Sequence, residues 1–397
     1  MALPAGPGPI FDAAVVGAGA AGLAAALALA REGFETCLVG RFDARADGRT
    51  IALLDGSVRF LEALGVWEGL RERAAPLATM RIIDDSRSLF RPPPAGFRAT
   101  EIGLEAFGWN VENVELVRTL IEAARASSQL TLRDPGAVDS SFLQEVANIG
   151  LEDGSIVSAR LVVAADGRNS RLREARDITT RSWSYPQSAL TTILAHERDH
   201  RDASTEFHTR FGPFTLVPLP GRRSSLVWVT NRAHAERLVG LDDDALGAAV
   251  ERQAQSILGK MRVEGPRGLV AMSGLSVERY TAERLALIGE AAHVFPPIGA
   301  QGLNLGFRVA QGRRVAEGAD IGGPAALGRY QRSRDLDVRL RTAAVDGLNR
   351  TLLADFLPVD LLRGIGLLAL AGIGPLRRAA MREGVQPSLG APRLMRA

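Results

Sequence analysis

Three glycines near the start of the chain have the spacing of a nucleotide-binding turn. Gly17, Gly19 and Gly22 follow a short apolar run at 13–16 and precede an alanine- and leucine-rich run that reaches Arg31. In a G-x-G-x-x-G turn the first glycine makes the tight bend, the second admits a pyrophosphate, and the third lets helix and strand pack closely. A second apolar run follows. The sequence therefore predicts strand, turn, helix and strand, arranged to bind a dinucleotide.

A second chemical segment is "LALIGEAAHVFPPIGAQGLNLG", residues 285–306. A short apolar strand ends in Glu290, His293, two prolines and a run of glycines, and a helix is expected again from Leu303. Phosphates and carbonyl oxygens are often bound where a chain enters a helix N-terminus. The break in the strand therefore marks a candidate binding site.

A third segment, "LEDGSIVSARLVVAADGRNSRLR", predicts a hairpin that turns at Asp153 and Gly154. Its second strand delivers Asp166 to a turn before a short helix. A left-handed turn with Ser170 as the helix cap accounts for this segment by itself. Cofactor binding by Asp166 is the alternative interpretation.

Composition excludes several classes of function. The chain has 397 residues with 48 Lys plus Arg against 45 Asp plus Glu, spread evenly, so a nucleic-acid partner is not expected. Cys37 is the single cysteine, which excludes an internal disulfide and a thiolate metal cluster. No metal site is expected. The uncharged run at 13–30 is divided by glycines and predicts no membrane span, so a cytoplasmic location is expected.

Together the three segments resemble the flavoprotein aromatic hydroxylases with the p-hydroxybenzoate hydroxylase fold. The chain is most similar to the ubiquinone-biosynthesis hydroxylases, also through "GRTIALLDGSVRFLEALGVWE", "FGWNVENVELVRTLIEAA" and "FTLVPLPGRRSSLVW". The resemblance runs from Phe11 to about Gly374. It implies an α/β fold in which a Rossmann-type FAD-binding domain carries an inserted β-sheet substrate domain and a C-terminal helical segment.

The resemblance also implies a discontinuous domain organisation. The FAD-binding domain is expected at 11–75, 98–178 and 275–325, the substrate-binding sheet at 76–97 and 181–274, and the C-terminal helical region at 326–397. The uncharged stretch 364–376 lies between arginines. It is expected either to pack on the FAD domain or to lie at a membrane surface.

Several FAD contacts are implied position by position. Glu290 stands where the family usually has an aspartate that binds a flavin ribitol hydroxyl, and Arg49 aligns with an arginine near the pyrophosphate. Asn113 is expected either to bind FAD or to cap the following helix. Gly40 and Arg41 occupy the usual place of a ribose-binding acid. Either Asp43 or Asp47 supplies this contact from the loop, or the contact is absent and both acids are solvated loop residues, which is the favoured alternative. The expected cofactor-binding residues are Gly17, Gly19, Gly22, Arg49, Asn113, Asp166, Glu290, Gly299, Gly302, Leu303 and Asn304.

For the substrate, the resemblance points to backbone carbonyls at Pro296 and Pro297, with Pro297 positioning the phenol. His293 is a candidate base, and a structural role is the alternative. Phe211 and Phe214 are candidate pocket residues, together with Leu216, Val217 and Trp228; plain sheet core is the alternative for this set.

The implied reaction is hydroxylation of the aromatic ring of a polyprenylated phenol in ubiquinone biosynthesis, with NAD(P)H and O₂, through a flavin C4a-hydroperoxide. A second glycine turn is lacking, so NAD(P)H is expected as a transient co-substrate. Partners in a ubiquinone-biosynthesis complex and peripheral contact with the inner membrane are further expectations. The alternatives are hydroxylation of another aromatic compound, a catalytically weak flavin-binding scaffold, and an NAD-dependent dehydrogenase, which leaves 285–306 unexplained.

Overall fold

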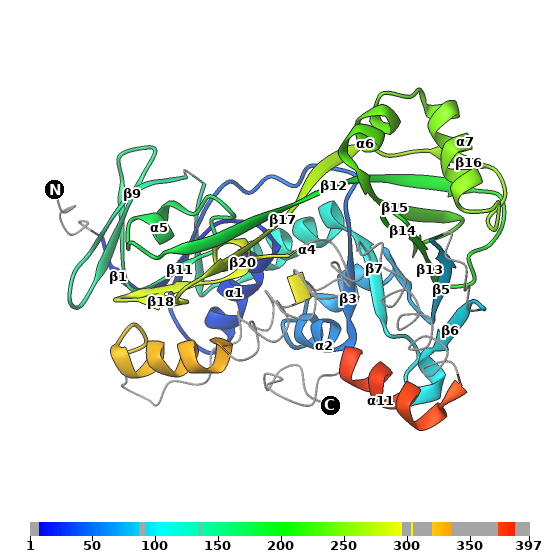
Figure 1. Cartoon of the computed structure of the whole chain (residues 1–397). Coiled ribbons are helices and arrows are strands. Elements are labelled where there is room, and N and C mark those ends of the chain that lie inside the picture. The colour runs from blue at the N-terminus through cyan, green and yellow to red at the C-terminus, as the bar shows by residue number, and fades with distance from the viewer. Residues whose placement is uncertain are drawn as a thin grey trace.

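The computed structural model of the chain describes residues 8–86, 93–134, 136–295, 303–304, 320–335 and 372–385 (Figure 1). Four of the expected site residues lie outside these ranges: Pro296, Pro297, Gly299 and Gly302. Within the described ranges the chain forms two large sheets and one small one, with helices packed against them. The α/β fold class expected from the sequence is confirmed.

The first sheet begins with β1 (Ile10–Val16), which is followed by α1 (Ala20–Arg31) and β2 (Thr36–Val39). These strands are parallel, and the order across the sheet is β18-β19-β11-β1-β2-β8. The last four residues of β1 and all of β2 are buried, as expected for parallel strands covered on both faces. The other members are β8 (Leu130–Arg133), β9 (Ala137–Phe142), β10 (Ala147–Leu151), β11 (Ile156–Ala164), β18 (Thr281–Ala282) and β19 (Leu285–Leu287).

A small antiparallel sheet packs beside the first one and contains β3, β7 and β4. Its strands are β3 (Thr50–Leu54), β4 (Ala74–Pro76) and β7 (Gly108–Glu112). The helices of this region are α2 (Asp55–Ala63), α3 (Trp67–Arg71) and α4 (Asn113–Ala126). Buried residues of these helices form one hydrophobic core with α1. The small sheet is thereby fixed against the first sheet and α1, which together we call the nucleotide-type fold.

The third sheet has nine strands and brings together segments that are distant in the sequence. Its order is β20-β17-β12-β15-β14-β13-β5-β6, and β16 also pairs with β12. The strands are β5 (Thr79–Asp85), β6 (Ala95–Arg98), β12 (Thr180–His196), β13 (Ala203–Thr209), β14 (Gly212–Leu219), β15 (Arg223–Asn231), β16 (Met261–Val263), β17 (Gly268–Val277) and β20 (His293–Val294). The early hairpin β5–β6 is joined to the rest by parallel pairing of β5 with β13.

The two faces of the nine-stranded sheet have different surroundings. Helices α6 (Arg232–Val239) and α7 (Asp243–Gln253) lie over one face, which we call the back face (Figure 1). Phe207 and Leu226 of this face share a buried core with both helices. The opposite face, which we call the front face, carries Ser225, whose hydroxyl accepts a hydrogen bond from Thr50 on β3 at 2.7 Å. The front face is therefore turned toward the small sheet.

The C-terminal region is described only in part. Residues 324–335 are helical, and α11 (Gly374–Val385) packs against the short helix η1 (Ala99–Ile102). Arg377 of α11 donates a hydrogen bond to Glu101 at 2.5 Å. Most of the uncharged stretch 364–376 lies outside the described residues. Of the helices that are described, none has the length and apolar character required to cross a membrane.

Candidate functional site

The three motifs meet at one edge of the first sheet. Strands β19, β11 and β1 are neighbours and parallel, so their carboxyl ends lie side by side. Gly17 follows β1, Asp166 follows β11, and Glu290 lies in η2 (Gly289–Ala291) just after β19. In such sheets ligands usually bind at the carboxyl ends of the parallel strands, at the point where the strand order reverses.

The glycine turn contains two glycines that the protein itself requires. Gly17 has φ +118, and a Cβ there would lie 2.2 Å from the carbonyl oxygen of Ala165. A Cβ at Gly22 would lie 1.9 Å from the carbonyl oxygen of Gly17. Both positions exclude any side chain because backbone atoms occupy the space.

Gly19 differs, because a Cβ there would meet no atom of the described residues within 4 Å. Packing therefore does not explain this glycine, and the open space in front of it leaves room for a bound group. Gly19 is also the N-cap of α1, whose first turn has no side-chain cap and no acid. The free N–H groups and the positive end of the helix dipole suit a pyrophosphate.

Asp166 combines a turn contact with an unused acceptor. Its Oδ2 accepts a hydrogen bond from the backbone N–H of Leu172 at 3.3 Å. Its Oδ1 is enclosed and has no hydrogen-bond partner among the described residues. Burial raises the pKa of the Asp166 carboxyl above its usual value. A buried carboxylate oxygen without a donor costs free energy, so this atom fits a ligand hydroxyl.

The turn that holds Asp166 also has the predicted local structure. Gly167 has φ +85, in the left-handed region. The hydroxyl of Ser170 accepts a hydrogen bond from the N–H of Arg173 at 3.1 Å and caps α5 (Arg171–Glu174). The predictions of a left-handed turn and a serine cap are confirmed.

Arg173 is a further residue of this edge that the sequence does not reveal. Its guanidinium is buried and donates to the carbonyl of Ala291 at 3.1 Å and to that of Arg168 at 2.9 Å. Arg173 therefore ties the Asp166 turn to the turn of Glu290. In an arginine-rich chain its position on a short polar helix looks like a surface position, so no sequence signal singles it out.

Glu290 is exposed and forms no hydrogen bond with a described residue. The preceding Gly289 has φ +57, and its Cβ position lies 3.1 Å from the Cβ of Ala21. This contact places the η2 turn beside the first turn of α1. Glu290 therefore lies near the glycine turn, with its carboxylate available to a ligand.

His293 is buried on β20, where it pairs with Ser276 of β17. Its ring lies against Phe295 with a centroid distance of 5.0 Å and an interplanar angle of 40°. This packing agrees with the structural alternative. A role of His293 as a base remains a prediction.

Arg49 and Asn113 are brought together by Asp47. The Nε of Arg49 donates to Oδ2 of Asp47 at 2.7 Å, and Nδ2 of Asn113 lies 3.5 Å from the same oxygen. Asp47 is thus engaged with Arg49. Of the two roles left open for Asn113, the helix cap is wrong: β7 leads directly into α4, so Asn113 is the first helical residue and Glu112 is the N-cap. FAD binding by Asn113 remains a prediction.

The end of β2 explains the absence of a ribose-binding acid. A Cβ at Gly40 would lie 2.8 Å from the N atom of Ala18, in the glycine turn. The packing of this turn therefore excludes any side chain at Gly40. Arg41 pairs with Glu152 at 3.2 Å, and Asp43 forms an ion pair with Arg45.

Asn304 anchors the second chemical segment. Its Oδ1 accepts hydrogen bonds from the N–H of Leu54 at 2.9 Å and the hydroxyl of Ser57 at 2.6 Å. Its Nδ2 donates to the carbonyl of Ala52 at 2.8 Å. The neighbouring Leu303 packs on the core that includes α1. The side chain of Asn304 thus clamps this turn onto β3 and α2.

The predicted pocket residues do not lie together: Trp228 belongs to the back-face core, whereas Val217 lies opposite Ser225 on the front face of the nine-stranded sheet. Phe214 is fully buried in the back-face core, with ring centroids 5.6 Å from Phe207 and 5.1 Å from Trp228. Leu216 belongs to the same core. These contacts agree with the plain-core alternative. Phe211 lies in the β13–β14 turn and is 46% exposed; substrate contacts of Phe211 and Phe214 remain predictions.

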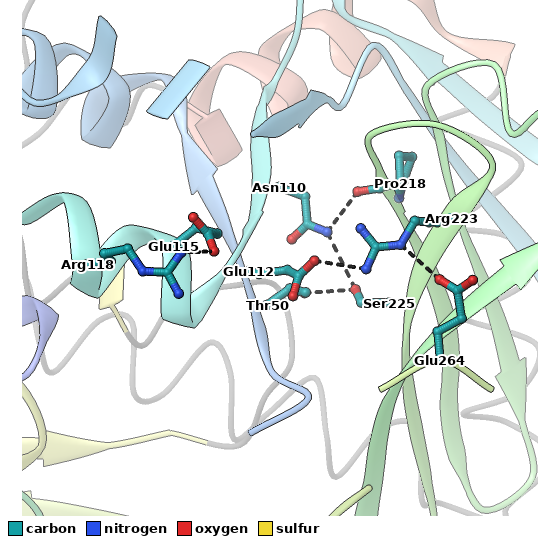
Figure 2. Close-up of polar contacts among 9 residues, drawn as sticks. All are labelled: Thr50, Asn110, Glu112, Glu115, Arg118, Pro218, Arg223, Ser225 and Glu264. Carbon is teal, nitrogen blue, oxygen red and sulfur yellow. Dashed lines mark hydrogen bonds and ion pairs between the residues drawn. The ribbon is translucent and has the colours of Figure 1, made fainter. Parts of the chain in front are cut away.

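A polar seam holds the front face of the nine-stranded sheet against the small sheet (Figure 2). Besides the bond between Thr50 and Ser225, Nδ2 of Asn110 donates to the carbonyl of Pro218 at 2.8 Å. Arg223 reaches Glu112 of β7 at 3.0 Å and Glu264 at 3.0 Å. These contacts fix the distance between the nucleotide-type fold and the front face.

Comparisons with known proteins agree with this architecture. A family model described as FAD binding domain matches residues 11–333. The ubiquinone hydroxylase UbiL of Rhodospirillum rubrum is 34% identical over 98% of this chain and 93% of its own. The 3-demethoxyubiquinol 3-hydroxylase of Escherichia coli is 29% identical over 94% of this chain and 97% of its own. The structure of p-nitrophenol 4-monooxygenase PnpA from Pseudomonas putida has a TM-score of 0.77 at 15% identity, over 94% of this chain and 97% of that one.

Proposed function

Because this chain belongs to the FAD binding domain family, we propose that it is an FAD-dependent monooxygenase that hydroxylates a polyprenylated phenol in ubiquinone biosynthesis. The similarity to two named quinone-pathway hydroxylases over nearly the full length of the chain supports this function. The observation that carries the proposal is the uncapped glycine turn, where no described residue fills the Cβ position of Gly19, at the sheet edge that also carries Asp166.

The residues at the sheet edge fit FAD. The turn at Gly17, Gly19 and Gly22 and the N-terminus of α1 would hold the pyrophosphate. Asp166 and Glu290 would accept hydrogen bonds from hydroxyl groups of the cofactor. Arg49 would stand beside the pyrophosphate, where its planar guanidinium suits phosphate oxygens. The backbone at Gly299, Gly302, Leu303 and Asn304 would approach the flavin ring.

When bound and reduced, FAD supplies the activation of O₂ and the oxygen atom that enters the aromatic ring. The chain must bind the ring, orient it and exclude water. The front face of the nine-stranded sheet would cover the ring, and the carbonyls of Pro296 and Pro297 would hold the phenol. NAD(P)H would act as a transient co-substrate. Peripheral membrane contact and partners in a biosynthetic complex belong to the same proposal.

The test is product formation by the purified full-length protein. FAD binding is followed by flavin absorbance, and a series of prenylated phenols is offered with NADH or NADPH under air. We expect one added oxygen atom in the product by mass spectrometry, with ¹⁸O incorporated from ¹⁸O₂. Protein that binds and reduces FAD but hydroxylates no phenol contradicts the catalytic proposal and favours the scaffold. Colourless protein that takes up no FAD contradicts flavin binding altogether.

A further inference from the structure

Glu206 lies on the front face of the nine-stranded sheet. Along β13, Phe207 belongs to the back-face core, so its neighbours Glu206 and His208 point to the other side. In the register of the sheet Glu206 lies opposite Thr215 of β14, which lies opposite Val227 of β15. Val227 is two residues from Ser225, which contacts β3. Glu206 therefore faces the side where the nucleotide-type fold lies.

Two neighbours hold the carboxylate of Glu206. The Nε2 of His208 lies 2.8 Å from Oε1, and the hydroxyl of Thr215 donates to Oε2 at 3.2 Å. Each carboxylate oxygen has a second lone pair, so Glu206 retains two acceptor positions. The arrangement fixes the carboxylate as a hydrogen-bond acceptor, and it keeps the N–H of His208 directed at Oε1.

Glu206 is the accessible member of this pair. Its side chain is 30% exposed, whereas that of His208 is 10% exposed. Thr215, Val217 and Val227, which lie on the same face of the neighbouring strands β14 and β15, are also partly exposed. This part of the front face therefore offers the carboxylate of Glu206 together with partly exposed valines, which matches a ring with a polar substituent.

Enclosed polar atoms without partners also gather on this face. The Nδ1 of His208, the Oγ1 of Thr191 and the Oε1 of Gln187 have no hydrogen-bond partner among the described residues. Thr191 lies opposite Val227 and therefore also belongs to the front face. Such atoms cost free energy unless a ligand or water supplies the missing bond. They show that hydrogen bonding on the front face is incomplete among the described residues.

On four strands of the front face the acids outnumber the bases. On β5, β13, β14 and β15, which are fully described, the acids of this face are Glu206 and Asp84. Arg223 is the one arginine or lysine at a front-face position of these strands, and it already pairs with Glu112 and Glu264. No cation of these four strands is left to neutralise a carboxylate on the ligand.

We propose that Glu206 is a specificity-determining residue of the hydroxylase. It accepts a hydrogen bond from a hydroxyl group of the aromatic ring, and its charge disfavours a ring that bears a carboxylate. Like charges brought together away from water repel strongly, so this contact discriminates between neutral and anionic rings. The inference rests on the hydroxylase function proposed above.

The test uses a matched pair of ligands and the FAD-loaded full-length protein. One ligand is a phenol with a single prenyl group ortho to the hydroxyl, and the other is the same compound with a carboxylate para to the hydroxyl. The dissociation constants are read from the change in flavin absorbance. We expect wild-type protein to prefer the neutral phenol by roughly tenfold or more, because like charges repel. In Glu206→Gln the ratio of the two dissociation constants is expected to fall by a similar factor, mainly because the carboxylate-bearing ligand binds more tightly.

Glu236→Gln serves as the matched control, because Glu236 lies on α6 behind the sheet and pairs with Arg232. Glu236→Gln should leave the ratio of the two dissociation constants at its wild-type value. If Glu206→Gln fails to fold, Thr215→Val removes the hydrogen bond to Oε2 and should narrow the ratio by a smaller factor. A ratio that stays at the wild-type value in a folded variant overturns the inference. Hydroxylation of a prenylated phenol by wild type in the product assay described above leaves the proposed function standing, whereas wild-type protein that binds neither ligand contradicts both proposals.

Discussion

Gly19 and Gly22 belong to the same turn, but glycine is required at the two positions for different reasons. Backbone atoms of the protein fill the space at Gly22, whereas no atom of the part of the chain that the structure describes lies near the Cβ position of Gly19. The G-x-G-x-x-G spacing predicted both roles from the sequence. The structure adds the distances that separate a packing glycine from a binding glycine.

Substituting each glycine by alanine should separate the two effects. Gly19→Ala is expected to lower FAD affinity at least about tenfold while reducing the free energy of unfolding of the apoprotein by less than about 1 kcal/mol. Gly22→Ala forces the backbone to move and is expected to cost about 1–3 kcal/mol of stability. Urea denaturation and FAD titration measure the two quantities. A Gly19→Ala protein that binds FAD as wild type does would contradict the phosphate site.

Asp166 provides a pH test at the same scale. Burial raises its pKa in the folded protein. Ionisation therefore opposes folding: this group leaves stability intact below its unfolded pKa, about 3.9, and lowers stability as pH rises through the folded pKa. In the apoprotein, Asp166→Asn is expected to be more stable than wild type at pH 7, with the gap closing as pH falls toward about 4. The urea midpoints of wild type and variant, measured between about pH 4 and pH 7, test this expectation. A difference in stability that does not change with pH would refute it.

At the scale of elements, the strands were easier to predict than their faces. Alternation along 214–217 predicted a strand, but the pattern is the same whichever face is turned toward the site. Phe214 and Leu216 proved to belong to the back-face core, because α6 and α7 cover that side. The cap at Asn113 was mispredicted for a related reason: a strand that runs directly into a helix leaves no loop residue to act as the cap.

Asn304 shows how one side chain can join distant elements. It makes three hydrogen bonds to the region of β3 and α2, which is about 250 residues earlier in the chain. Asn304→Ala would leave buried groups of β3 without partners and is expected to cost about 2–4 kcal/mol of stability, together with FAD affinity. Thermal unfolding with and without FAD measures both. Ser57→Ala, which removes one of these bonds, should show the smaller loss, and an equal loss would contradict the clamp.

For the whole molecule, the decisive feature is the pairing of segments that lie far apart in the sequence. Strand β5 pairs in parallel with β13, and β11 is flanked by β1 and β19. Periodicity describes each strand but not its partner, so this arrangement was expected only through the resemblance to a family. Arg173 escaped prediction for the same reason, because its burial depends on how the turns after β11 and β19 meet.

The seam of Figure 2 sets how the front face stands above the site. Arg223 bridges Glu112 of β7 and Glu264, so its loss should let the sheet shift relative to the nucleotide-type fold. Chemistry between a bound cofactor and a ring is sensitive to misplacement of about 1 Å. Arg223→Met is therefore expected to lower the hydroxylated product formed per NAD(P)H consumed, with hydrogen peroxide accounting for the difference.

The stability of this variant should change little, because half-exposed ion pairs contribute about 0–1 kcal/mol. Arg118→Met is the matched control: Arg118 pairs with Glu115 on the outer surface of α4, away from the seam (Figure 2). It should keep the wild-type ratio of product to NAD(P)H. If both variants keep that ratio, the seam does not control the geometry of the site, and the position of the ring must depend on contacts nearer to the sheet edge. If only Arg223→Met forms less product per NAD(P)H, the contacts between the small sheet and the nine-stranded sheet control the geometry of the site.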